Sequence, residues 1–142
     1  YTPGVTVFKT DTSNQKLLDE KDWYDVDVIT CAAPNLRERP SNRFNQNNGD
    51  HAVKVSDREL LEIHKKRLTR ILDVAALNNA EVVILGAFGC GAFQNKPEVV
   101  ARAAKEVITD YLQVFKTIEF AVYCSPRDDT NFRVFKRVLG MM

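Results

Sequence analysis

A glycine-rich stretch between Gly86 and Pro97 carries the residues best suited to chemistry in this chain. It reads GAFGCGAFQNKP, and three of the six glycines of the chain fall at Gly86, Gly89 and Gly91. Glycines accept positive φ angles and let a backbone approach a ligand closely, so successive free amides can surround phosphate oxygens. The spacing matches neither the dinucleotide fingerprint nor the Walker loop. We therefore predict a phosphate-binding loop of another type, with a tight turn that binds nothing as the alternative.

Three side chains within this stretch suggest further roles. Phe88 and Phe93 flank the glycines, and we expect one ring to pack inward and the other to lie over a sugar or base of a nucleotide. Cys90 sits between two glycines, which raises the hypothesis of a nucleophile. No histidine lies in the stretch to activate this thiol, so the sequence disfavours that role.

The elements around the stretch follow from hydrophobic patterns. Strands are predicted where β-branched and apolar residues cluster, and helices where apolar residues recur at helical spacing after a cap. Ser56 and Glu59 form the pattern of a capping box, and Pro97 suits the first position of a helix. The predicted strands are 5–8, 23–33, 81–86 and 117–124, and the predicted helices are 56–79, 97–112 and 128–139. Strands that alternate with helices predict an α/β fold whose mostly parallel or mixed sheet carries helices on both faces.

The same patterns predict which side chains are buried. The run 82–85 shows no alternation, which is typical of a central strand covered on both faces. His64 lies beside the apolar stripe of the first helix, where we expect a packed or half-exposed ring. The apolar faces of the last two helices are predicted to include Tyr111 and Leu112, and Phe132, Phe135, Val138 and Leu139.

The ends of neighbouring strands supply further candidate binding residues. In open α/β sheets, ligands bind beyond the carboxyl ends of the strands. Asn35 and Asn131 follow two of these strands and carry amides that read the edge of a base or ribose. Asp128 is predicted to cap the last helix. Residues 35–55 are polar and without period, and we expect a mobile surface loop there.

Composition limits the classes of function. The 142 residues predict a single domain, and a formal net charge of +1 gives no reason to expect direct DNA binding. The three cysteines, without zinc-type spacing, predict free thiols in the cytoplasm and no metal site. No apolar run is long enough for a membrane span, and no motif calls for a cofactor.

Two segments resemble a known family. VITCAAPN at 28–35, followed by VVILGAFGCGAFQNKPEVVA at 82–101, is similar to the microbial-type poly(ADP-ribose) glycohydrolases, which have a macrodomain-like fold. The resemblance implies that the glycine stretch holds the diphosphate of ADP-ribose, that Phe93 lies near the distal ribose, and that the segment after the last strand helps to form the adenine side. Together with the residues argued from the loop and the strand ends, the predicted ligand-binding residues are Gly86, Phe88, Gly89, Cys90, Gly91, Ala92, Phe93, Asn35, Asn131 and Phe132.

The chain departs from the family at its catalytic motif. The family carries a GGG stretch and a Gln-Glu-Glu triplet upstream of the part matched here, and the chain contains neither. We therefore expect no catalytic residue in this chain, a domain truncated at its N-terminus, and a companion fragment or a homodimer at an exposed sheet.

Three functions stay open from the sequence. The first is the ADP-ribose-binding portion of an enzyme that hydrolyses ribose–ribose glycosidic bonds when intact. The second is a non-catalytic reader of ADP-ribose or a related nucleotide, and the third is a structural fragment that oligomerises.

Overall fold

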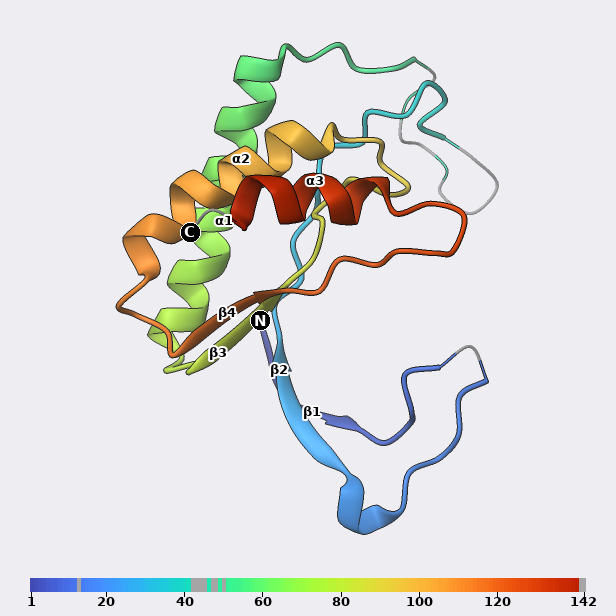
Figure 1. Ribbon diagram of the computed structural model, residues 1–142, viewed down its shortest axis with the longest axis vertical. Coiled ribbons are helices and arrows are strands. Elements are labelled where there is room, and N and C mark those ends of the chain that lie inside the picture. Colours follow the sequence, from blue (N-terminus) through green and yellow to red (C-terminus); the bar gives the residue numbers. More distant parts are fainter. Residues whose placement is uncertain (13, 42–45, 47–48, 50, 141–142) are drawn as a thin grey trace. The chain divides into compact units, whose positions relative to one another are not determined.

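The computed structural model describes residues 1–12, 14–41, 46, 49 and 51–140, and its contacts divide the chain into two compact units (Figure 1). The first unit is Tyr1–Thr30 and the second is Cys31–Met142. The predicted loop 35–55 falls partly outside the described residues. Its mobility, like the single domain over 1–142, stays a prediction. The elements in chain order are β1 (Thr2–Val7), a 3-10 turn (Glu20–Asp22), β2 (Tyr24–Val28), α1 (Asp57–Leu77), β3 (Val82–Leu85), α2 (Pro97–Ile108), a 3-10 turn (Thr109–Tyr111), β4 (Thr117–Phe120) and α3 (Thr130–Leu139).

The first unit is an antiparallel pair of strands. β1 and β2 pair with Val5 opposite Val26, and the register shifts between Thr2 and Val5. Gly4 lies at this irregularity with φ +62°, and its amide donates to Asp27 Oδ1 at 2.9 Å. Both strands were predicted, but β2 ends before residue 33, and none of its residues is buried.

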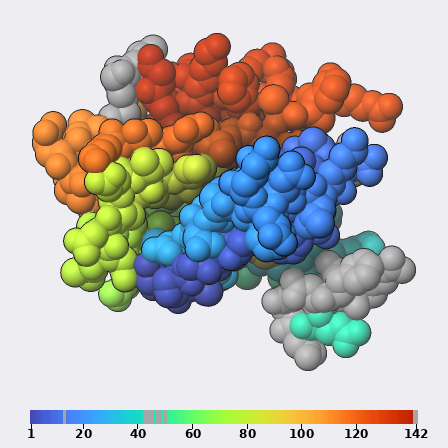
Figure 2. All heavy atoms as spheres, turned by 90° about the horizontal axis from the view of Figure 1, so that it is seen from below, coloured from blue at the N-terminus to red at the C-terminus, as the bar shows by residue number. Residues whose placement is uncertain are grey.

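The second unit is built on the parallel pair β3–β4, with Leu85 opposite Phe120. Figure 2 shows the segments that contain β3 (yellow-green) and β4 (orange) adjoining at the surface. Val83 and Leu85 are each 8% exposed, whereas Val82 and Ile84 are 54% and 66% exposed. The mixed α/β class is confirmed, but the described helices leave one face of β3 open. The prediction of two covered faces for β3 is therefore wrong. It failed because a continuous apolar run does not reveal how many faces of a strand are covered.

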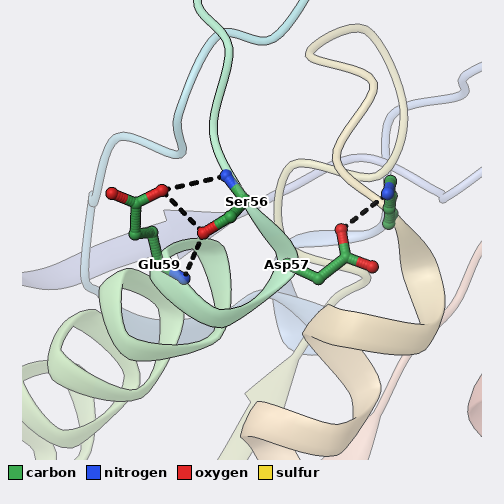
Figure 3. Close-up of polar contacts among 4 residues, drawn as sticks. Ser56, Asp57 and Glu59 are labelled. Carbon is green, nitrogen blue, oxygen red and sulfur yellow. Dashed lines mark hydrogen bonds and ion pairs between the residues drawn. The ribbon is translucent and has the colours of Figure 1, made fainter.

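The capping box at the start of α1 is confirmed (Figure 3). Ser56 Oγ accepts from the amide of Glu59 at 3.3 Å, and Glu59 Oε2 accepts from the amide of Ser56 at 3.0 Å. The neighbouring Asp57 forms an ion pair of 2.6 Å with Lys96, the residue before α2 (Figure 3). This contact joins the beginnings of the two helices.

The core of the second unit lies between helices α1 and α2. The apolar stripes that face each other match the predicted periodicity: Leu60, Leu68, Ile71, Leu72 and Ala75 on α1, and Val99, Val100, Ala103, Ala104 and Val107 on α2. Because α2 ends at Ile108, Leu112 lies beyond the stripe and is 53% exposed, so its predicted burial is wrong. Tyr111 instead donates to Asp73 Oδ1 at 2.6 Å. None of the helices among the described residues is long and apolar enough to cross a membrane.

Candidate ligand-binding site

The loop between β3 and α2 has a shape that only glycine permits at one position. Gly89 has φ +79°, a conformation that side chains disfavour. A Cβ atom added at Gly89 would lie 2.6 Å from Cβ of Ala33 and 2.7 Å from Nδ2 of Asn95. Gly91 differs, because a Cβ atom there meets nothing within 4 Å. Gly89 is therefore required by the packing of the loop, and Gly91 faces open space.

The loop folds on itself and leaves four of the five amides of residues 89–93 free. The amides of Phe88, Cys90, Gln94 and Asn95 donate to carbonyls within the loop at 2.9–3.0 Å. The amides of Gly89, Gly91, Ala92 and Phe93 donate to no other described residue. A short run of backbone N–H groups of this kind forms an anion-binding concavity. Within residues 89–93 of the predicted phosphate loop, only the amide of Cys90 is therefore already used.

Asn95 holds this loop from the inside. Its side chain is buried, at 2% exposure of the residue. Its Nδ2 donates to three backbone carbonyls, those of Pro34 at 2.7 Å, Gly89 at 3.0 Å and Phe93 at 3.3 Å. The sequence analysis missed this residue. Its one signal, a position shortly before Pro97, indicates a turn rather than a buried anchor.

His64 completes the anchor from α1. Its Nε2 lies 2.9 Å from Asn95 Oδ1, and because Asn95 Nδ2 already donates to carbonyls, Nε2–H is the donor and Oδ1 the acceptor of this hydrogen bond. The ring is fully buried and meets Phe88 edge-on, with ring centroids 5.5 Å apart. Burial lowers the pKa of His64, although the bond to Asn95 opposes this and nearby Arg67 adds to it. The prediction of a packed histidine is confirmed.

The segment after β2 lies against the same loop. The amide of Leu36 donates to the carbonyl of Phe93 at 3.0 Å. Asn35, a predicted binding residue, uses its side chain within its own turn: Oδ1 accepts from Nε of Arg37 at 3.2 Å, and Nδ2 donates to the Pro40 carbonyl at 3.4 Å. The structure therefore brings Asn35 to the site as a residue that shapes the turn.

Two predicted site residues direct their side chains inward. Phe88 and Cys90 are partly buried and pack against a cluster formed by Val100 and Ala101 of α2 and by two residues of α3, Val134 and Phe135. Burial, with a smaller effect from Glu98, raises the pKa of the Cys90 thiol to about 12. A thiol with that pKa is protonated near neutral pH, which argues against a nucleophile. Only the backbone of these two residues faces the loop interior.

The remaining candidates begin α3. Phe132 is 41% exposed, so the prediction that it faces inward is wrong; the buried residues of this helix are Val134 and Phe135. Nζ of Lys136 lies 5.8 Å from the Phe132 ring centroid. Asn131 is half-buried beside it. Asp128 Oδ1 accepts from the amide of Thr130 at 3.0 Å, but the N-cap of α3 is Asp129, so the prediction that Asp128 caps this helix is wrong.

The site offers no set of metal ligands within the described residues. No group of three or more His, Cys, Asp or Glu side chains is placed there to hold a metal ion. The site offers backbone amides, the rings of Phe93 and Phe132, and the guanidinium of Arg37. These groups are suited to binding a nucleotide phosphate.

Comparison with family models finds no match for the chain, and comparison with curated protein sequences finds none either. Solved structures do match. Poly(ADP-ribose) glycohydrolase from Deinococcus radiodurans in complex with ADP-ribose is 30% identical, with a TM-score of 0.76 over 98% of this chain and 51% of that one. The apo form of the same enzyme gives 30% identity and a TM-score of 0.73, over 98% and 52% of the two chains.

A second organism gives the same result. The glycohydrolase from Thermomonospora curvata is 27% identical, with a TM-score of 0.74 over 96% of this chain and 45% of that one. The chain spans about half the length of each of these proteins. Over nearly its whole length, this chain therefore shares the fold of about half of a microbial poly(ADP-ribose) glycohydrolase, and the resemblance predicted from its sequence is confirmed.

Proposed function

We propose that this chain is the ADP-ribose-binding portion of a poly(ADP-ribose) glycohydrolase-like protein. The observation that carries the proposal is the set of four unengaged amides at residues 89 and 91–93, held in place by buried Asn95. Such amides suit the two phosphates of ADP-ribose. A similar solved structure contains that ligand. The ring of Phe93 would then lie near the distal ribose, and Asn131 and Phe132 near the adenine.

The experiment is a calorimetric titration of ADP-ribose into this chain, with AMP and ribose 5-phosphate for comparison. The test variant is Gly91→Glu, which places a carboxylate in the open space in front of the amides. We expect binding by the wild type and a loss of at least tenfold in the variant, because like charges repel in the phosphate site. Gln113→Glu is the matched control, since it adds the same charge at an exposed position after α2.

Either of two results would overturn this assignment. One is a folded wild-type chain that gives no heat with ADP-ribose. The other is binding that Gly91→Glu and Gln113→Glu affect equally, because the phosphates would then lie elsewhere.

The intact protein is proposed to hydrolyse the ribose–ribose bonds of poly(ADP-ribose) in the cytoplasm. Glycoside hydrolysis requires a carboxylic acid that protonates the leaving oxygen. Glu98, the acidic residue in the first turn after the loop, instead pairs with Arg137 at 3.5 Å. The general acid is therefore proposed to come from a companion segment that carries the GGG and Gln-Glu-Glu motifs.

The companion segment is proposed to cover the exposed face of β3. Val82 and Ile84 present apolar side chains there, and exposed apolar patches mark contact surfaces. Sedimentation of the chain with and without such a segment tests this. We expect a one-to-one complex that Ile84→Asp weakens, whereas Leu77→Asp, at another exposed apolar position, does not. Self-association that the companion leaves unchanged would favour a homodimer instead.

A further inference from the structure

Arg37 occupies a fixed position beside the loop. Its Nη2 donates to the Pro40 carbonyl at 3.0 Å, and its Nε to Asn35 Oδ1 at 3.2 Å. The guanidinium carbon lies 5.7 Å from the centroid of the Phe93 ring, within the range of a cation–π contact. Three contacts from three different residues thus hold one flexible side chain, so little entropy is left to lose when it binds a ligand.

The charge of Arg37 is not neutralised by its neighbours. Its partners are a carbonyl, an amide oxygen and an aromatic ring, and no carboxylate of the described residues pairs with it. Its Nη1 donates to no group among the residues that the structure describes. Guanidinium groups with free N–H donors bind phosphate oxygens well, because two parallel bonds form at once.

Phe93 relates the Arg37 guanidinium to the free amides. The ring of Phe93 carries the guanidinium, its own amide is one of the four free donors, and its carbonyl accepts from Leu36, next to Arg37. The cation and one of the free amides therefore meet at a single residue, Phe93. Backbone amides bring only partial charge, whereas a diphosphate carries two full negative charges, and the guanidinium supplies a full positive charge beside the same residue.

We propose that Arg37 is a binding residue for the diphosphate that the free amides hold, positioned for this role by Asn35 and the Pro40 carbonyl. The inference deepens the proposed function and rests on it. It also assigns Asn35 the part of a positioning residue for Arg37, in place of a direct contact with a base.

The test compares Arg37→Gln with Arg39→Gln by calorimetry in the full chain. Both variants remove one positive charge from the same segment, but Arg39 is exposed and forms no hydrogen bond or ion pair with another described residue. We expect Arg37→Gln to weaken ADP-ribose binding by about tenfold or more, since a charge-assisted hydrogen bond contributes about that factor. Arg39→Gln should stay within about twofold. Arg37→Lys should retain part of the affinity, because the charge remains and the paired donors are lost.

Three further readouts separate binding from a structural role. Adenosine has no phosphate, so its affinity should be the same for the wild type and Arg37→Gln. This affinity is measured by letting adenosine displace a fluorescent ADP-ribose analogue from each protein. The salt dependence of ADP-ribose binding should become weaker in Arg37→Gln, since screening then acts on fewer charges. Arg37→Gln should also unfold at a temperature close to that of the wild type.

The outcomes distinguish this inference from the function on which it rests. Wild-type binding that Arg37→Gln leaves unchanged would overturn the role of Arg37 and leave the proposed function standing. An equal loss for adenosine and ADP-ribose would show that Arg37 only shapes the site. A folded wild-type chain that does not bind ADP-ribose would overturn both.

Discussion

Asn95 shows how much a single buried amide can determine. It is 2% exposed and joins three segments that are far apart in the sequence: the residues after β2 through Pro34, the glycine loop through Gly89 and Phe93, and α1 through His64. A buried amide is retained only when its donors and acceptor are all satisfied, and this one is. Neither aspartate, with no donor at the carbonyls, nor a longer glutamine would reproduce the arrangement.

Replacing Asn95 by alanine should therefore damage stability and binding together. The Pro34 carbonyl and Nε2 of His64 would lose their only partner among the described residues, whereas the carbonyls of Gly89 and Phe93 would keep the backbone amides of Asn95 and Leu36. Each buried group left unpaired costs about 1–3 kcal/mol, so we expect a loss of about 2 kcal/mol or more in the free energy of unfolding, measured with urea. Gln113→Ala, at an exposed position, should change it by less than about 0.5 kcal/mol. Equal values for the two variants would contradict the anchoring role.

His64 should make stability depend on pH. Its pKa in the folded chain lies below the ordinary 6.5 because the ring is buried, so the unfolded chain binds a proton more readily. The contribution of His64 is therefore present above pH 6.5 and is lost as the pH falls through the lower, folded pKa. We expect the free energy of unfolding to decrease from about pH 7 to pH 5, by at most about 1.4 kcal/mol per pH unit for one proton.

The controls for this pH dependence come from the only other histidine. His51→Gln, at an exposed position, should keep the wild-type dependence, and His64→Gln should flatten it. Imidazole NMR signals provide a check that does not require His64→Gln to fold. A His64 signal that titrates at or above pH 6.5 in the folded chain would contradict the prediction.

At the scale of elements, the helices could be read from the sequence because each has a local cause. Apolar residues at helical spacing mark the stripe of α1, and the capping box fixes where it begins. Pro97 fixes the start of α2. The ends were harder: α2 stops at Ile108 and gives way to a 3-10 turn, although the apolar pattern continues to Leu112. The pattern for β4 likewise extends to Cys124, but pairing with β3 ends at Phe120, since partners in the other strand decide where a strand stops.

The start of α1 can be tested by Ser56→Ala. The hydroxyl of Ser56 accepts from the amide of Glu59, and removal of a cap of this type costs about 1 kcal/mol. We expect a corresponding loss in the free energy of unfolding by thermal or urea denaturation. Thr69→Ala, in the exposed middle of the same helix, should be neutral or slightly stabilising because alanine is the better helix former. A cost no larger than that of Thr69→Ala would show that the box does not stabilise the helix.

At the scale of the whole molecule, the α/β class and the position of the ligand loop could be predicted, and the coverage of the sheet could not. The loop was found because glycines directly after an apolar strand are a local signal. Coverage of β3 depends on what packs against Val82 and Ile84. A run of four apolar residues occurs both in strands with one covered face and in strands with two, so it does not distinguish them. The contact between Asn95 and His64 escaped prediction for a similar reason, since it joins residues with no relation along the sequence.

The close approach of Gly89 to Ala33 has a consequence for attempts to change what the site accepts. Cβ of Ala33 fills the space that any larger residue at position 89 would need, so diversity introduced at position 89 in a library would be eliminated by misfolding before ligand preference could be selected. Positions 91 and 92 are exposed, and residue 91 has room for a side chain. Directed evolution of this protein toward other nucleotides should therefore keep residues 33 and 89 constant and place its variation two and three residues further along the loop.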